Sequence, residues 1–268
     1  MKANLLRRCA ALVILFLLVG CSVPPASNNQ PPANAPVVQP ALVGQGWTIG
    51  IDPGHGWKDS SGAVGNGLRE DDVTLDIAVR TKAILDKNGF QTFLSRTGYD
   101  TVHGLSYAAV AINAGNPDLA VSIHANSSKG TTGDGTEACY MMNTQWDKQS
   151  KSLADLLAAS VSSELGLRNR GIFPENAGDR CARSNTTGWT QLYFHNFNAP
   201  AALIETAFLS NPVEADMLNR RSQDFAQAIA DAIMAYVRNA GTPGDVPSGT
   251  SVVASTPVVV AGGTPTNT

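Results

Sequence analysis

The stretch IGIDPGHG, residues 49–56, opens with apolar and small residues and ends in a turn that carries a histidine. The run Trp47 to Asp52 is predicted to be a buried strand, because it is short, apolar and closed by Pro and Gly. Gly54 and Gly56 allow a tight turn and leave room beside the imidazole of His55. The stretch therefore predicts a strand that ends in a loop presenting an ionisable ring.

Short apolar runs and helical patterns alternate through the rest of residues 47–240. Helices are predicted over 70–88 and 150–165, and a third begins at Ser222, which is expected to cap it. Further strands are predicted at Phe90 to Ser95, Leu119 to His124, Glu137 to Met142 and Ala201 to Thr206. This alternation favours an α/β fold, with a mostly parallel sheet flanked by helices in one domain.

The composition disfavours two classes of protein. Hydrophobic residues make up 43% of the 268 residues, which is too many for a wholly disordered chain. The 19 Lys and Arg against 22 Asp and Glu give a formal charge of −3, which supplies no basic surface for nucleic acid. The four cysteines are too few for a disulfide scaffold. For Cys139 and Cys181, a bridge and a pair of buried thiols both stay open.

The first 21 residues have the features of an export and lipidation signal. Basic residues precede the apolar run 10–19, which has the length of a signal-peptide core and is short for a membrane span. The run ends in LVGC, residues 18–21, which resembles a bacterial lipobox and implies lipid attachment at Cys21. We expect residues 1–20 to be a lipoprotein signal peptide, with cleavage at another position as the alternative.

Two further segments have no apolar period. Residues 21–46 comprise the lipidated Cys and a flexible linker rich in Pro, Asn, Gln and Ala. Residues 241–268 are a Thr/Pro/Gly/Val-rich tail, which we expect to be disordered. The protein is expected in the cell envelope, on the periplasmic side of the outer membrane if the organism is Gram-negative.

Ionisable residues follow or end three of the predicted strands. His55 follows the first strand, His124 lies in SIHAN at 122–126, and Glu205 lies in ALIET at 202–206. Ligands bind at the carboxyl ends of strands in open α/β sheets, so these groups are predicted to converge. Glu70, which opens the helix after the first strand, reaches the same edge. Two imidazoles and a carboxylate are the ligand set of a catalytic zinc site with one position left for water.

Each residue also has a structural interpretation. A single His at a strand end is more often hydrogen-bonded than metal-bound, and Glu70 suits the positive end of a helix dipole. Asp52 is interpreted as a residue that organises the loop or supports a ligand. Glu205 lies within an apolar run, where a carboxylate must be paired, bound to metal or functional.

The ordered set of motifs resembles the zinc-dependent N-acetylmuramoyl-L-alanine amidases of bacterial peptidoglycan. The matching stretches follow the family order and cover nearly all of residues 47–220. They are IGIDPGHG at 49–56, Glu70 with Val73 and Leu75, Arg96, DLAVSIHAN at 118–126, Gly135 with Glu137, and LIETAFLSNP at 203–212.

The resemblance implies roles for four residues. His55, Glu70 and His124 would bind Zn²⁺, and Glu205 would be catalytic. The reaction would be hydrolysis of the amide between the lactyl group of N-acetylmuramic acid and L-Ala of the stem peptide, in wall remodelling or daughter-cell separation. The family fold is a mixed, mainly parallel sheet flanked by helices.

Further predictions concern binding and regulation. Asn126, Trp57 and His195 are candidates for substrate binding. The stretch 143–150 is too short for the helical insert that plugs the zinc site of some Gram-negative relatives, so an open site is expected. The expected partners are peptidoglycan and, through the lipid, a membrane; the need for an activator protein stays open. The alternatives are a non-catalytic wall-binding or regulatory lipoprotein and a zinc peptidase of the stem.

Overall fold

The computed structural model describes residues 42–56, 61–99, 105–175 and 196–243. The predicted signal peptide, Cys21 and nearly all of the linker lie outside these residues. The predictions for Trp57, Cys181, His195 and residues 244–268 lie outside them as well.

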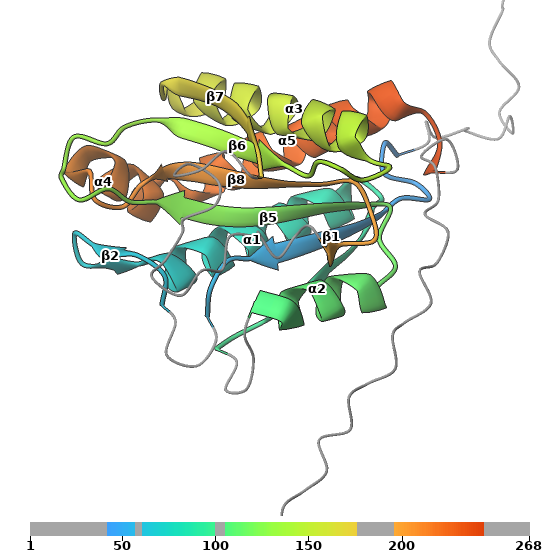
Figure 1. Ribbon diagram of the computed structural model, residues 1–268, viewed down its shortest axis with the longest axis horizontal. Coiled ribbons are helices and arrows are strands. Elements are labelled where there is room, and N and C mark those ends of the chain that lie inside the picture. The colour runs from blue at the N-terminus through green and yellow to red at the C-terminus, as the bar shows by residue number, and fades with distance from the viewer. Residues whose placement is uncertain (1–41, 57–60, 100–104, 176–195, 244–268) are drawn as a thin grey trace, which may run out of the picture. The chain divides into compact units, whose positions relative to one another are not determined.

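A six-stranded mixed sheet forms the centre of the domain (Figure 1). Its spatial order is β4-β1-β5-β8-β6-β7. The first four strands in this order are mutually parallel, and β6 runs antiparallel to β8. The predicted mixed, mainly parallel sheet is therefore confirmed. The strands are β1 (Thr48–Pro53), β4 (Gln91–Leu94), β5 (Leu119–Asn126), β6 (Thr136–Tyr140), β7 (Asn169–Pro174) and β8 (Ala201–Phe208).

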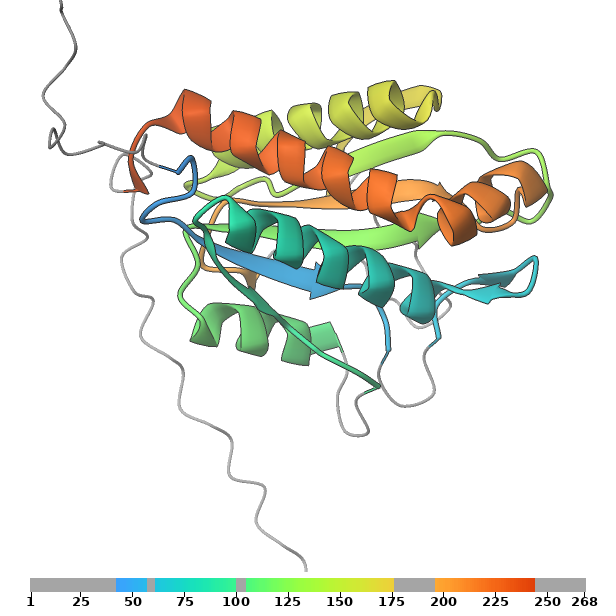
Figure 2. The ribbon, with the colours of Figure 1, turned by 180° about the vertical axis from the view of Figure 1, so that it is seen from behind.

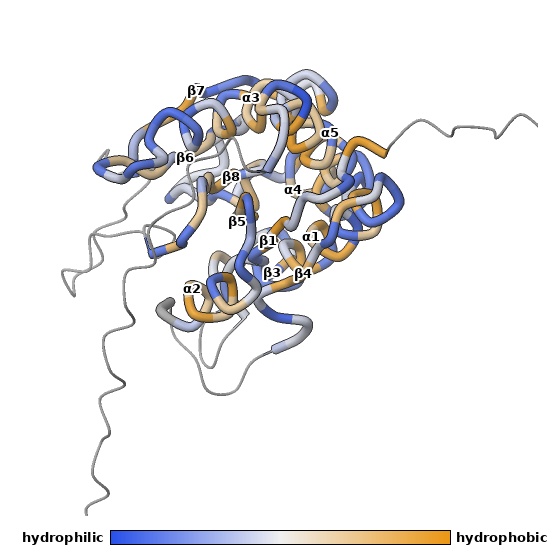
Figure 3. The backbone as a smooth tube through the Cα atoms, turned by 90° about the vertical axis from the view of Figure 1, so that its right-hand side faces the viewer, coloured by the Kyte–Doolittle hydropathy of each residue, from blue (hydrophilic) through white to orange (hydrophobic). Residues whose placement is uncertain are grey.

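Helices cover both faces of this sheet. Figure 2 shows the long helices side by side on one face, and Figure 3 shows a short helix on the other face. The long helices alternate between hydrophobic and hydrophilic residues along the chain, and their apolar residues form one core with the sheet. The three long helices are α1 (Glu70–Lys87), α3 (Asp147–Leu165) and α5 (Ser222–Ala240), and the short one is α2 (Leu105–Ala114).

Five elements were absent from the sequence prediction. The edge strand β7 was not predicted, because the arginines within residues 168–190, among them Arg168 and Arg170, favour a solvated loop face, with a wall that grips acidic groups of the stem peptide as the alternative. The hairpin of β2 (Val64–Gly65) and β3 (Leu68–Arg69), the helix α4 (Pro212–Arg220) and the short helix α2 were also missed. The hairpin strands are too short, and α4 is too polar, to show a clear apolar period.

Ser222 does not cap its own helix as predicted. Arg221 occupies the N-cap position of α5, without a side-chain cap. Ser222 instead lowers the pKa of Asp76 on α1 through a side-chain hydrogen bond. Ser222 therefore links α5 to α1, a contact between distant parts of the chain that a local capping pattern does not reveal.

The described fold begins before Trp47. Residues 42–46 form a turn in which the Gly44 amide donates to the Asn88 carbonyl at 2.9 Å. None of the helices in the described residues is both long enough and apolar enough to span a membrane. The connection between β6 and α3, residues 141–146, contains no inserted helix.

Candidate metal centre

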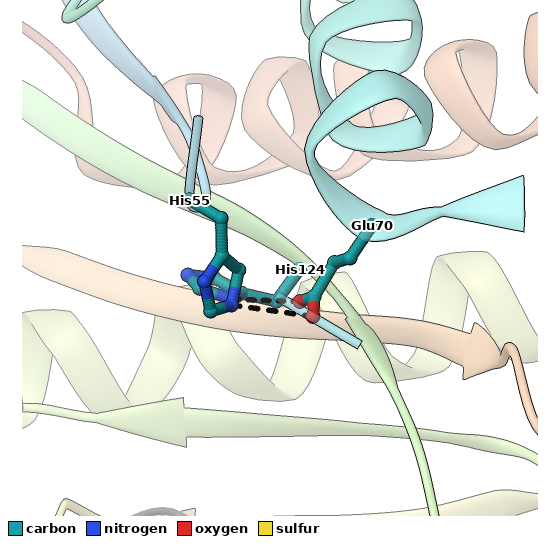
Figure 4. A group of neighbouring side chains, drawn as sticks. All are labelled: His55, Glu70 and His124. Carbon is teal, nitrogen blue, oxygen red and sulfur yellow. Dashed lines mark hydrogen bonds and ion pairs between the residues drawn. The ribbon is translucent and has the colours of Figure 1, made fainter. Parts of the chain in front are cut away.

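The structure brings His55, Glu70 and His124 together at one point beside the sheet (Figure 4). His55 follows β1, Glu70 is the first residue of α1, and His124 lies in β5. His55 Nε2 lies 3.2 Å from one Glu70 carboxylate oxygen, and His124 Nδ1 lies 3.0 Å from the other. The convergence predicted from three separate motifs is therefore observed.

Glycines make this close arrangement possible. A Cβ at Gly54 would lie 2.4 Å from the His124 ring, and one at Gly62 would lie 2.4 Å from Glu70 Oε2. Gly62 has a φ of +68°, and His55 itself has a φ of 61°, a region that non-glycine residues rarely occupy. The loop is thus shaped to present His55, although Gly54 makes room for His124 rather than for His55 as predicted.

Glu70 is held in place by the backbone as well as by the two histidines. The amide of Ala63 donates to Glu70 Oε2 at 2.7 Å, and the amide of Ala125 donates to Oε1 at 3.1 Å. Burial raises the pKa of Glu70, but hydrogen bonds and charge interactions with His124 and His55 outweigh it and hold the pKa well below its usual range. Glu70 is therefore a fixed carboxylate, as a metal ligand must be.

The three side chains fit a zinc ion. Their ligand atoms all lie within 4.8 Å of one another, and two imidazoles with one carboxylate are a known catalytic zinc set. Glu70 and His124 have side chains only 5% and 9% exposed, whereas that of His55 is 23% exposed. His55 is therefore the most exposed of the three side chains.

Glu205 lies next to His124 in the sheet. The two residues are register partners of the parallel strands β5 and β8, so their side chains leave the same face. Every other residue of β8 is buried, whereas Glu205 is only partly buried. Both strands continue past these residues, to Asn126 and Phe208, so neither His124 nor Glu205 is at a strand end as predicted.

A second carboxylate, Glu137, flanks Glu205 on its other side. Glu137 of β6 is the antiparallel register partner of Glu205. Its Oε1 accepts from Asn126 Nδ2 at 2.9 Å, and its Oε2 accepts from Arg170 Nε at 2.6 Å. The prediction of a solvated arginine face is wrong for Arg170, which balances the charge of a buried carboxylate. Arg168 does follow that prediction, with a side chain 65% exposed.

The remaining predicted residues are engaged in the protein. Asp52 accepts hydrogen bonds from Ser95 Oγ at 2.5 Å and Ser122 Oγ at 2.8 Å, which fits a residue that organises the loop. Asn126 donates to Glu137, and substrate binding by Asn126 stays a prediction. Cys139 is buried and disulfide-bonded, whereas its pairing with Cys181 stays a prediction because Cys181 is outside the described residues.

Known proteins resemble this chain in sequence and in fold. Residues 49–235 match the Amidase_3 family, described as N-acetylmuramoyl-L-alanine amidase. The chain is 34% identical over 220 residues to the N-acetylmuramoyl-L-alanine amidase LytC of Bacillus subtilis, covering 79% of this chain and 41% of LytC. It is 30% identical to the germination-specific N-acetylmuramoyl-L-alanine amidase of the same organism, covering 74% of this chain and 83% of that protein.

Solved structures give the same result. An N-acetylmuramoyl-L-alanine amidase from Clostridium difficile 630 superposes with a TM-score of 0.63 at 29% identity, covering 74% of this chain and all of the other. The catalytic domain of CwlV from Bacillus (Paenibacillus) polymyxa gives 0.58 at 29% identity, covering 72% of this chain and 98% of that domain. With its matching motifs, sheet and His-Glu-His group, this chain belongs to the N-acetylmuramoyl-L-alanine amidase family.

Proposed function

We propose that the protein hydrolyses the amide between the lactyl group of N-acetylmuramic acid and L-Ala of the peptidoglycan stem, with Zn²⁺ as cofactor. The observation that carries the proposal is the convergence of His55, Glu70 and His124 at one accessible point, beside Glu205 in the next strand. Family membership supports the choice of this bond. Because this chain spans less than half of LytC, the activity of that whole protein comes to this chain only as a proposal.

The proposed chemistry divides between the metal ligands and Glu205. When bound, zinc supplies Lewis-acid chemistry, lowering the pKa of a water and polarising the carbonyl that is attacked. His55, Glu70 and His124 would hold that charge at the edge of the buried core. Glu205 accepts the proton of the attacking water and returns it to the departing amine, which is a poor leaving group until it is protonated.

Two rival functions make different demands on the same residues. A wall-binding lipoprotein has no need of three converging ligands and a carboxylate beside them. A zinc peptidase of the stem would use the same four groups, so only the bond that is cut separates it from an amidase. The products of the reaction therefore decide between the three functions.

The test uses the purified full chain with zinc on isolated peptidoglycan sacculi. We expect new L-Ala amino termini without new reducing sugars, and their loss when a chelator is added. Glu205→Gln removes the proton acceptor and keeps the size of the side chain, so we expect at least about a 100-fold loss of rate. Glu164→Gln, an exposed substitution on α3, should keep the parent rate.

Each result has one meaning. New D-amino-acid or diaminopimelate termini would make the protein a stem peptidase. Tight binding to sacculi without new termini, in a preparation loaded with zinc, would contradict the proposed activity. A Glu205→Gln variant with the parent rate and the parent circular dichroism would leave zinc hydrolysis standing but remove Glu205 from the chemistry.

We further propose export and lipid attachment at Cys21, which would place the domain 47–240 beside the cell wall. The support is the basic start, the short apolar run and the LVGC sequence at 18–21. Mass spectrometry of the protein from its native membrane should find Cys21 as an acylated N-terminus. An unmodified Cys21 within a longer chain would contradict this proposal and leave the proposed enzyme activity unaffected.

A further inference from the structure

The guanidinium of Arg96 joins two parts of the chain that carry proposed metal ligands. Arg96 follows β4 and is 9% exposed. Its Nε donates to the Pro53 carbonyl and its Nη2 donates to the Gly54 carbonyl, both at 2.9 Å. The same Nη2 donates to the Asp71 carbonyl at 2.9 Å. One side chain therefore binds the loop after β1 and the first turn of α1.

Thr74 makes a second link between the same two segments. Its hydroxyl donates to the Gly54 carbonyl at 2.8 Å and lies 3.2 Å from Arg96 Nη2 as an acceptor. Gly56 makes room for this arrangement, because a Cβ there would lie 2.5 Å from the Arg96 guanidinium carbon. The loop, the helix and the arginine are therefore packed as one unit.

The bonds of Arg96 lie next to two of the three proposed metal ligands. The carbonyls of Pro53 and Gly54 come directly before His55, and the carbonyl of Asp71 comes directly after Glu70. Arg96 lies on the chain beyond both segments, yet it bonds to each of them. A change in these bonds would alter the distance between the His55 ring and the Glu70 carboxylate. Metal–ligand distances tolerate changes of only about 0.2 Å, so such a change would weaken metal binding.

We propose that Arg96 is a positioning residue, which fixes His55 against Glu70 and so sets the affinity and geometry of the metal site. The proposal rests on the proposed metal centre. Residues that orient metal ligands change metal affinity by about 10- to 100-fold when they are substituted. Arg96→Met, which keeps the apolar stem and removes all donors, is expected to weaken zinc binding by that factor.

The experiment measures metal binding rather than activity. Zinc affinity of the full chain is measured by competition with a chromophoric chelator, and the Co²⁺ derivative is examined by its visible absorption spectrum. Arg96→Lys keeps the charge and one donor nitrogen, so it should recover part of the zinc affinity. Thr74→Val should weaken zinc binding a few-fold. Arg220→Met is the matched control, because that side chain is 74% exposed and, among the described residues, bonds only to Asp216 on its own helix.

All variants are compared at a temperature where circular dichroism shows each of them folded. If Arg96→Met fails to fold, Arg96→Lys and Thr74→Val carry the test. Parent affinity and a parent Co²⁺ spectrum in the folded variants would overturn the proposal. A parent chain that binds no zinc would instead overturn the metal centre itself, so the two failures are distinguishable.

Discussion

At the scale of single residues, Gly54 packs very closely against the imidazole of His124. A Cβ at residue 54 would lie 2.4 Å from Cε1 and 2.5 Å from Nε2 of that ring. Real side chains do not approach so closely, so either the loop or the ring must move. The glycine is thus required by the space that His124 occupies, which follows from the fold and not from the turn alone.

Gly54→Ala is therefore expected to displace His124 and to weaken zinc binding by at least about 10-fold. The measurement is the same chelator competition as for the arginine variants. Gly130→Ala is the matched control, since a Cβ there meets nothing within 4 Å. Equal zinc affinity of the parent and the Gly54→Ala variant would show that the loop relaxes without disturbing the ligand.

At the scale of elements, the edge strand β7 is joined to its neighbour by a charge pair as well as by the backbone. Arg170 of β7 contacts Glu137 of β6, where the strand register shifts. Arg170 also lies over the ring of Phe208, with its guanidinium carbon 4.9 Å from the centroid. Since Glu137 has a side chain only 3% exposed, the arginine is needed to balance its charge.

Arg170→Met is expected to lower the free energy of unfolding by about 3–5 kcal/mol, because it leaves a buried carboxylate without its cation. Urea unfolding measures the change. Arg168→Met, which removes an exposed pair with Asp134, should cost less than about 1 kcal/mol. The double variant Glu137→Gln, Arg170→Met should be more stable than Arg170→Met alone. If it is not, the loss comes from packing on Phe208.

At the scale of the whole molecule, the last helix packs against the residue that precedes the first strand. Tyr236 of α5 packs edge-on against Trp47, which directly precedes β1, with ring centroids 6.5 Å apart. Tyr236 is buried, and burial raises its pKa to about 12. The first and last parts of the domain thus meet around a phenol that is hard to ionise.

This pKa makes stability depend on pH in the alkaline range. The folded state keeps the Tyr236 proton up to about pH 12, whereas the unfolded chain releases it near pH 10. The contribution to stability is therefore complete below pH 10 and is lost as the pH rises toward 12. Urea unfolding between pH 9 and pH 11 should show a smaller loss for Tyr236→Phe than for the parent. Tyr107→Phe, on the exposed side of α2, should behave as the parent does.

Local patterns in the sequence determined the fold class and the residues proposed for the site. The α/β order, the β1 loop and the long helices follow from apolar periodicity and glycine placement, which are properties of neighbouring residues. The family motifs named His55, Glu70, His124 and Glu205, and the structure places all four on adjoining elements. The role of Glu205 stays a prediction, since its position is compatible with catalysis but does not by itself test it.

Tertiary structure alone decided how these elements meet. No local pattern could show the antiparallel pairing of β6 with β8, the edge strand β7 or the bonds of Arg96, because each joins residues far apart in the sequence. From the sequence, Arg170 was expected to be a solvated surface residue. Its partner Glu137 is brought beside it only by the fold, and the sequence does not show which carboxylate will be buried there. Periodicity is local, whereas burial and pairing depend on the whole packed domain, and that is the physical reason for the division.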